Sequence, residues 1–225
     1  MKRYGQDKVW PFAEGGEGTI GVVTAVATLF LLLHRRFNNG FTKALFLLSS
    51  GIWLLILYFF RDPNRQTDAK PGLVVSPADG EIVAIIRERE NRYLNADTIR
   101  ISIFLSVTNV HVQRSPLNGR VTLVDHQPGK FLQAFRPEAS DINEYIAMII
   151  DTPYGPLLVK QIAGILARRC VNPMQIGDTL QTGQRFGLIR FGSRVDIFLP
   201  PNAQLLARIG DTVHGGLTPL AQLQE

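Results

Sequence analysis

The chain has 225 residues, a net charge of +5 at pH 7 and one cysteine, Cys170, so it is long enough for one domain with a substantial core plus an appendage. A single cysteine excludes a disulfide framework and a cysteine-rich zinc site, and we expect no metal centre. The basic balance fits an anionic membrane surface, whereas nucleic acid is disfavoured because aromatic side chains are not interleaved with the basic ones.

Two apolar runs, at residues 19–33 and 41–60, dominate the N-terminal part. The first run is too short for an upright membrane span and the second is just long enough, so two spans and a hairpin embedded in one leaflet both stay open. A signal peptide is disfavoured because no small-x-small cleavage pattern follows the first run. A helical hairpin buried in a soluble core is the remaining alternative, but neither run has amphipathic periodicity. We therefore predict a membrane-associated helical segment over residues 1–60.

Basic residues are more frequent outside the two apolar runs than between them. By the positive-inside rule, both ends of the segment and the domain that follows are expected on the cytoplasmic side of the cell membrane. The outer flanks carry Lys2, Arg3, Lys8, Arg61, Arg65 and Lys70, whereas Arg35 and Arg36 lie between the runs and Lys43 lies near the start of the second run.

A polar linker with two prolines is expected at residues 61–72, and a β-rich catalytic domain at residues 73–225. Many short strands bounded by turn residues are typical of an all-β sandwich or barrel. The expected strands are Leu73–Val75, 81–87, 98–105, 110–113, 119–125, 144–151, 157–162, 188–191, 194–199 and 203–209.

An internal repeat supports this fold class. The segment Ile-Gly-Asp-Thr-Leu-Gln-Thr-Gly at residues 176–183 recurs as Ile-Gly-Asp-Thr-Val-His-Gly-Gly at residues 209–216. The pattern resembles the hammerhead turns of biotinyl and lipoyl carrier domains, although no lysine occupies the carrier position. We therefore predict a mainly β, barrel-sandwich domain preceded by an N-terminal apolar helical hairpin.

Gly192 and Ser193 lie between two expected strands, at residues 188–191 and 194–199. By composition alone, the pair is typical of a tight turn. Glycine also lets a nucleophile approach its carbonyl closely, and a serine hydroxyl attacks such a carbonyl when a base takes its proton. The product is an ester in place of the peptide bond. Elimination across Ser193 then breaks the chain, and hydrolysis leaves a pyruvoyl group and ammonia.

A serine nucleophile needs a base, and a neutral histidine is the usual one. Of the four histidines, His34 lies between the apolar runs, His126 at a strand end and His214 in the second copy of the repeat. His111 is the one that valines flank on both sides, in an expected strand that would hold it rigidly. A histidine packed in the core remains the alternative interpretation.

Six segments of the chain carry a family resemblance. They are Phe-Phe-Arg-Asp-Pro at 59–63, Ser-Pro-Ala-Asp-Gly at 76–80, Asn-Val-His-Val-Gln-Arg at 109–114, Pro-Gly-Lys-Phe-Leu-Gln-Ala at 128–134 with Asn143 and Glu144, Gln-Ile-Ala-Gly-Ile-Leu-Ala-Arg-Arg at 161–169, and Phe-Gly-Ser-Arg-Val-Asp at 191–196. In this order they resemble the phosphatidylserine decarboxylase family in its short bacterial and archaeal form, over residues 41–225.

The resemblance implies a proenzyme that cleaves itself between Gly192 and Ser193, with Ser193 becoming a covalent pyruvoyl group. It assigns the base to His111 and the orienting carboxylate to Asp79, which local sequence alone would place in a β-turn. The implied reaction is decarboxylation of phosphatidylserine in the membrane to phosphatidylethanolamine. The two cleavage fragments are expected to remain together as a heterodimer, and a homo-oligomer stays open.

The substrate phosphate is anionic, so arginine, lysine or turn amides are expected to hold it. The candidates, which the sequence does not rank, are Arg114, Lys130, Arg168, Arg169 and Arg194. Some longer relatives have another histidine where this chain has Thr108, so the proton donor for decarboxylation stays open between His111 and water. Asn143 and Glu144 match a family motif without an assigned role.

Two other functions stay open. A membrane-anchored lipoyl-like domain could be a non-catalytic adaptor or carrier, which fits the repeat and the apolar runs but leaves Ser193, His111 and Asp79 without a purpose. A pyruvoyl enzyme could instead act on a soluble amino acid, but such an enzyme needs no membrane segment.

Overall fold

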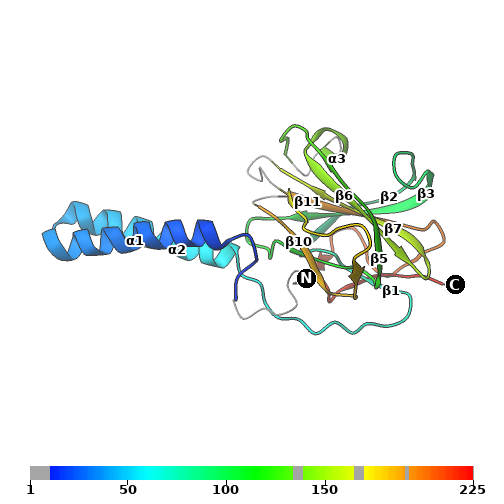
Figure 1. Cartoon of the computed structure of the whole chain (residues 1–225), viewed down its shortest axis with the longest axis horizontal. Coiled ribbons are helices and arrows are strands. Elements are labelled where there is room, and N and C mark those ends of the chain that lie inside the picture. The colour runs from blue at the N-terminus through cyan, green and yellow to red at the C-terminus, as the bar shows by residue number, and fades with distance from the viewer. Residues whose placement is uncertain (1–10, 134–138, 165–169, 191–192, 225) are drawn as a thin grey trace. The chain divides into compact units, whose positions relative to one another are not determined.

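The computed structural model describes residues 11–133, 139–164, 170–190 and 193–224, apart from the side chain of Asp141. The described chain divides after Pro63 into two compact units, one of helices and one of strands (Figure 1). Strands outnumber helices throughout the second unit, so the predicted mainly β class is confirmed.

The first unit is a pair of apolar helices, α1 (Glu17–Phe37) and α2 (Gly40–Phe59). The reversal between them has local causes. Asn38 takes up a left-handed conformation (φ 42°) that ends α1. Asn39 caps α2, because its side-chain oxygen accepts a hydrogen bond from the Thr42 amide at 2.9 Å. The predicted apolar helical hairpin is confirmed.

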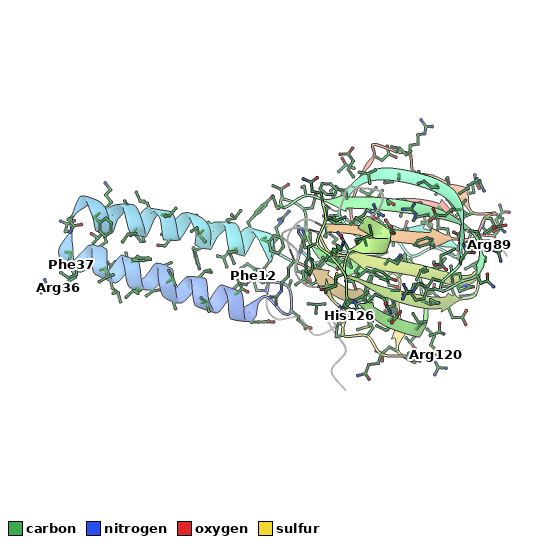
Figure 2. All side chains as sticks on the ribbon, turned by 90° about the horizontal axis from the view of Figure 1, so that it is seen from above. Phe12, Arg36, Phe37, Arg89, Arg120 and His126 are labelled. Carbon is green, nitrogen blue, oxygen red and sulfur yellow. The ribbon has the colours of Figure 1, made fainter. Side chains whose placement is uncertain are left out.

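The apolar side chains of the two helices are largely exposed, as the sticks along them in Figure 2 show. Val22 is 65% exposed and Leu48 is 63% exposed. A hairpin in a soluble core would bury these residues, so that alternative is not supported. By length and composition both helices can cross a membrane. The first is longer than its apolar run because the helix continues through the basic residues that follow.

An eight-stranded antiparallel sheet forms most of the second unit and curls into a half-barrel (Figure 1). Its order is β13-β2-β3-β11-β7-β6-β5-β9, and two three-stranded sheets, β1-β14-β12 and β4-β10-β8, accompany it. The bounds are β1 Leu73–Val75, β2 Gly80–Glu90, β3 Ala96–Leu105, β4 Val112–Arg114, β5 Gly119–Gln127, α3 Ala139–Ile142, β6 Tyr145–Thr152, β7 Gly155–Ile162, β8 Cys170–Val171, β9 Thr179–Leu180, β10 Arg185–Ile189, β11 Ser193–Leu199, β12 Gln204–Leu205, β13 Thr212–Val213 and β14 Pro219–Gln222.

Strand β11 is central to the sheet and buried on both faces. Val195, Ile197 and Leu199 belong to the main hydrophobic core. Because side chains alternate along a strand, Arg194 and Asp196 point to the opposite face. Ser193 shares the parity of Val195, so its side chain is directed toward the main core.

The two copies of the sequence repeat occupy equivalent places in the β unit. The equivalence extends to Ser-Pro-Ala-Asp-Gly at 76–80 and Ser-Pro-Leu-Asn-Gly at 115–119, so the repeat is longer than the eight residues first noted. We call residues 76–82 with 209–216 the Asp79 half, and residues 115–121 with 176–183 the Asn118 half. The matching amide-to-carbonyl bonds are Ile82 to Asp211 (3.0 Å) and Gly216 to Ser76 (2.7 Å) in the Asp79 half, and Val121 to Asp178 and Gly183 to Ser115 (both 2.8 Å) in the Asn118 half.

The strands differ from the sequence prediction mainly where they are short. The two-residue strands β8, β9 and β13 were not predicted, because two residues carry no alternation to detect. The strand expected at residues 203–209 is reduced to β12, and the strand expected at residues 188–191 begins earlier and ends at Ile189. Phe191, the last residue of that prediction, lies outside the described residues.

Candidate active site

Ser193 is the first residue of β11 and is fully buried. Its backbone pairs with Leu105, the last residue of β3. Its Oγ has no hydrogen-bond partner among the residues that the structure describes. A buried hydroxyl without a partner costs about 1–3 kcal/mol, and such groups cluster at functional sites. The preceding residue, Gly192, lies outside the described residues.

His111 is buried next to the strand that leads toward this junction. It directly precedes β4, and its carbonyl accepts a hydrogen bond from the amide of Ile189, the last residue of β10 (3.2 Å). The connection from β3 to β4 therefore starts beside Ser193, at Leu105, and ends at His111. The connection from β10 to β11 joins the same two sheets, so His111 and Ser193 each lie at an end of a connection between these sheets.

The imidazole of His111 is held in the form that a general base requires. Its Nδ1 lies 3.0 Å from the carbonyl oxygen of Asn109, and a carbonyl can only accept, so Nδ1 carries the hydrogen and Nε2 is the basic atom. Asn109 is fixed in turn, because its Oδ1 accepts from the amide and the hydroxyl of Ser106 at 2.9 and 2.7 Å.

Asp79 comes to the same end of the sheet from β2. Glu81 and Arg194 pair with Phe104 from its two sides. One residue earlier on β2 and β11, Gly80 and Ser193 therefore lie on the two sides of Leu105. Asp79 directly precedes Gly80. Asp79, Ser193 and the start of the β3–β4 connection therefore lie at the same end of these three strands.

The carboxylate of Asp79 binds Arg65, a residue that the sequence analysis placed in the linker. Arg65 donates to both carboxylate oxygens, at 2.8 Å for Oδ2, and the Gly215 amide donates at 2.8 Å. Nδ1 of His214 lies 3.5 Å away. Burial raises the pKa of Asp79, but the hydrogen bonds and charge of Arg65, together with the Gly215 amide and His214, outweigh it and hold the pKa below its usual value. The described contacts of Asp79 do not include His111. The Nδ1 atom of His111 instead contacts the carbonyl oxygen of Asn109.

Residues 53–221 match the family model described as phosphatidylserine decarboxylase. The chain belongs to the phosphatidylserine decarboxylase family. It is 40% identical over 218 residues to a phosphatidylserine decarboxylase proenzyme of Symbiobacterium thermophilum, covering 96% of this chain and 94% of the relative. A proenzyme of the same name from Burkholderia ambifaria is 40% identical over 220 residues, with the same coverage. One from Magnetococcus marinus is 44% identical over 178 residues, 77% of this chain and 81% of that protein. The predicted membership of this decarboxylase family is confirmed.

The basic residues proposed for the substrate phosphate lie in different environments in this decarboxylase. Arg114 is buried, and its Nη1 donates to the carbonyl of Gly183 at 3.1 Å. Arg194 is buried on the face opposite Ser193, and its Nη2 donates to Asp196 at 2.8 Å. Lys130 is exposed. Arg168 and Arg169 lie outside the described residues.

Asn143, which had no assigned role, joins three segments of the decarboxylase. Its Nδ2 donates to the carbonyls of Leu132 and Ala163 at 2.8 and 2.7 Å, and its Oδ1 accepts from the Leu132 amide at 2.8 Å. It therefore has a structural role beside β7.

Burial raises the pKa of the Cys170 thiol, which keeps it in the unreactive neutral form.

Arg65 and Asn109 are the site residues that sequence reasoning did not single out. Both lie in or next to the motifs that carried the resemblance, Asn109 within residues 109–114 and Arg65 two residues after the 59–63 segment. Their roles come from contacts that the sequence does not display. Arg65 meets a partner fourteen positions away and another 150 positions away.

Proposed function

We propose that this chain is a proenzyme that cleaves itself between Gly192 and Ser193 and then decarboxylates phosphatidylserine to phosphatidylethanolamine. The observation that carries the proposal is the buried Oγ of Ser193, which has no hydrogen-bond partner among the described residues, near the segment that carries His111. The relatives named above are called proenzymes, which supports cleavage of this chain as well.

The proposed cleavage begins when Nε2 of His111 takes the proton of the Ser193 hydroxyl. The Oγ attacks the carbonyl carbon of Gly192, the peptide C–N bond breaks, and His111 returns the proton to the freed amine. Loss of the Cα proton of Ser193 then expels the Gly192 carboxylate and leaves dehydroalanine. Addition of water releases ammonia and leaves the pyruvoyl group. In this proposal Asp79 favours the imidazolium that forms on His111, since an opposite charge stabilises the charged form.

The pyruvoyl group supplies an electron sink for loss of carbon dioxide from an α-amino acid. The chain's own contribution is to hold it. Burial of residue 193 and its pairing with Leu105 would limit the access of water and restrict the movement of the group. His111 or water is the proposed proton donor in the second reaction.

The two fragments are proposed to remain together after cleavage. Strand β11 pairs with β3 along Ser193–Leu199 and with β7 on its other side. Val195, Ile197 and Leu199 are fully buried, and each such side chain stabilises the association by about 1.5–3 kcal/mol. The C-terminal fragment also contributes β12, β13 and β14 to two sheets.

The apolar hairpin is proposed to bring the decarboxylase to its lipid substrate. The distribution of basic residues around α1 and α2 favours the cytoplasmic side for the β unit. Arg114, Lys130, Arg168, Arg169 and Arg194 remain the proposed holders of the phosphate. The pairing of Arg194 with Asp196 makes it the least suited of the described three.

A decarboxylation assay tests the function. Matured protein in detergent is supplied with phosphatidylserine or free serine, and carbon dioxide and phosphatidylethanolamine are measured. We expect rapid turnover of the lipid and far slower turnover of serine, which lacks the phosphate and acyl chains that position the carboxylate. Equal turnover of serine would move the assignment to a soluble amino acid. No turnover and no cleavage would favour a non-catalytic adaptor.

A further inference from the structure

The segment that follows the helices is a strap fastened to the β unit. We call residues 64–72 the strap. Asn64 accepts a hydrogen bond from Nη2 of Arg185 at 2.9 Å, and near the other end the Pro71 carbonyl accepts from Nε2 of Gln222 at 3.0 Å. Both partners lie far along the chain, so the strap is held at both ends.

The strap crosses the place where the two halves of the repeat meet. Gly183 and Gly216 are equivalent positions of the two copies, and both have left-handed backbones (φ 77° and 76°). A Cβ on Gly216 would lie 3.4 Å from the Cα of Gly183 and 3.4 Å from Oγ1 of Thr67, and a Cβ on Gly183 would overlap the same Thr67 oxygen. Thr67 of the strap therefore lies against both copies at once, and its side chain leaves no space for a Cβ at position 183.

Arg65 is the charged anchor of the strap. Its side chain is 9% exposed, and it grips both oxygens of Asp79 and the carbonyl of Gly215. The Gly215 amide binds Asp79 in return, which closes the network. A bidentate arginine–carboxylate pair fixes orientation as well as charge. When one partner of a buried pair is removed, the other charge is left uncompensated.

This pair exists in one half of the repeat and not in the other. Asn118 is the equivalent of Asp79, and Gln181 and Thr182 are the equivalents of His214 and Gly215. Asn118 is uncharged and needs no counter-charge. The charged half is the one whose β2 begins level with Ser193. The strap therefore binds the half that lies next to the proposed cleavage junction.

We propose that Arg65 is a positioning residue for self-cleavage: it docks the strap across the two halves and holds the side chain of Asp79 oriented directly before β2. This inference rests on the proposed function, because it assigns Arg65 a part in the maturation of the same site. The strap is then more than a spacer between the helices and the β unit, because cleavage depends on its binding to the β unit.

The test follows self-cleavage of the full chain, synthesised in a cell-free system with detergent, by gel electrophoresis over time and over a range of pH. The variants are Arg65→Gln, Arg65→Lys and Asp79→Asn, alone and with Arg65→Gln. The control is Lys70→Gln, which removes a strap cation that is 65% exposed and pairs with Asp68. Arg65 and His214 are the charged or titratable groups that the structure describes against Asp79, so the pH series is repeated in His214→Gln.

We expect Arg65→Gln to slow cleavage about 100-fold, the loss typical of a small misplacement in an active site. The cleavage rate of Arg65→Lys should lie between those of wild type and Arg65→Gln, because lysine keeps the positive charge but cannot bind both carboxylate oxygens as the guanidinium group does. The rate of Lys70→Gln should match that of wild type. Without Arg65, only the Gly215 amide and His214 still oppose the effect of burial on the Asp79 pKa. The decline of the rate in acid should therefore move to higher pH, in the His214→Gln background as well. In Asp79→Asn, adding Arg65→Gln should change little.

Thermal unfolding of Arg65→Gln in an uncut Ser193→Ala background separates positioning from folding. If Arg65→Gln fails to fold, the Arg65→Lys series decides. A wild-type rate in Arg65→Gln, a slow rate with an unmoved acid decline, or equal slowing by Lys70→Gln would overturn the inference while leaving the proposed function intact. An uncut wild-type chain would overturn both.

Discussion

The Asp79 half and the Asn118 half of the β unit share a backbone and differ in charge. Both use the same amide-to-carbonyl bonds and the same left-handed glycines. The Asp79 half carries the Asp79 carboxylate with an arginine and a histidine against it, whereas the equivalent positions of the Asn118 half, Asn118, Gln181 and Thr182, are uncharged. Turns and glycines therefore form the backbone that the two copies share. The proposed chemistry depends on the few positions at which the copies have different side chains.

The largest effect should come from the residues at the junction itself. Ser193→Ala removes the nucleophile and His111→Ala removes the base, so we expect both chains to remain uncut, as judged by gel electrophoresis of purified protein. His126→Ala is the matched control, because His126 lies on an exposed part of β5 (Figure 2) and should mature normally. Normal maturation of His111→Ala would assign the base to another group.

The next effect should separate the two halves directly. Asp79→Asn makes the Asp79 half resemble the other, and we expect cleavage to slow by about 10⁴-fold, the loss seen when the carboxylate of a serine–histidine–aspartate site is neutralised. Asn118→Asp makes the reverse change at an exposed position and should leave the rate unchanged. Equal rates for the two variants would show that the difference in charge has no part in maturation.

A pH-dependent stability difference should follow from the same pair. The pKa of Asp79 lies below its usual value in the folded chain, since Arg65, the Gly215 amide and His214 together outweigh the effect of burial. A carboxyl of this kind stabilises the fold above its unfolded pKa and loses that contribution as pH falls through its folded pKa. In the uncut Ser193→Ala chain, we expect the free energy of unfolding to fall on acidification, and to fall less when Asp79→Asn is added. Identical pH profiles would contradict the ion pair.

The smallest effect on maturation should come from removing the hairpin. A chain that starts at Arg61 lacks α1 and α2 but keeps Arg65 and the rest of the strap, so it should be soluble and cut at the wild-type rate. A chain that starts at Leu73 lacks the strap and should mature poorly. Sedimentation and gel electrophoresis measure both properties. Failure of the longer chain to fold would make the hairpin part of the core.

The sequence predicted the features that are long or repeated. The apolar helices, the longer strands and the hammerhead-like turns all carry patterns that local reasoning detects. The arrangement around Asp79 was not predictable, because Arg65 reaches it from a segment with the composition of a plain linker. The Asn109 carbonyl that orients His111 was missed for a related reason. Backbone contacts of this kind leave no trace in residue type.

Self-cleavage is tested most directly by the intact mass of the purified full-length chain under denaturing conditions. We expect two masses, one for residues 1–192 and one for residues 193–225, the smaller lacking a free amino terminus because a pyruvoyl group replaces it. The Ser193→Ala chain should give a single uncut mass. A single uncut wild-type chain in a preparation that releases carbon dioxide from phosphatidylserine would contradict the proposed mechanism.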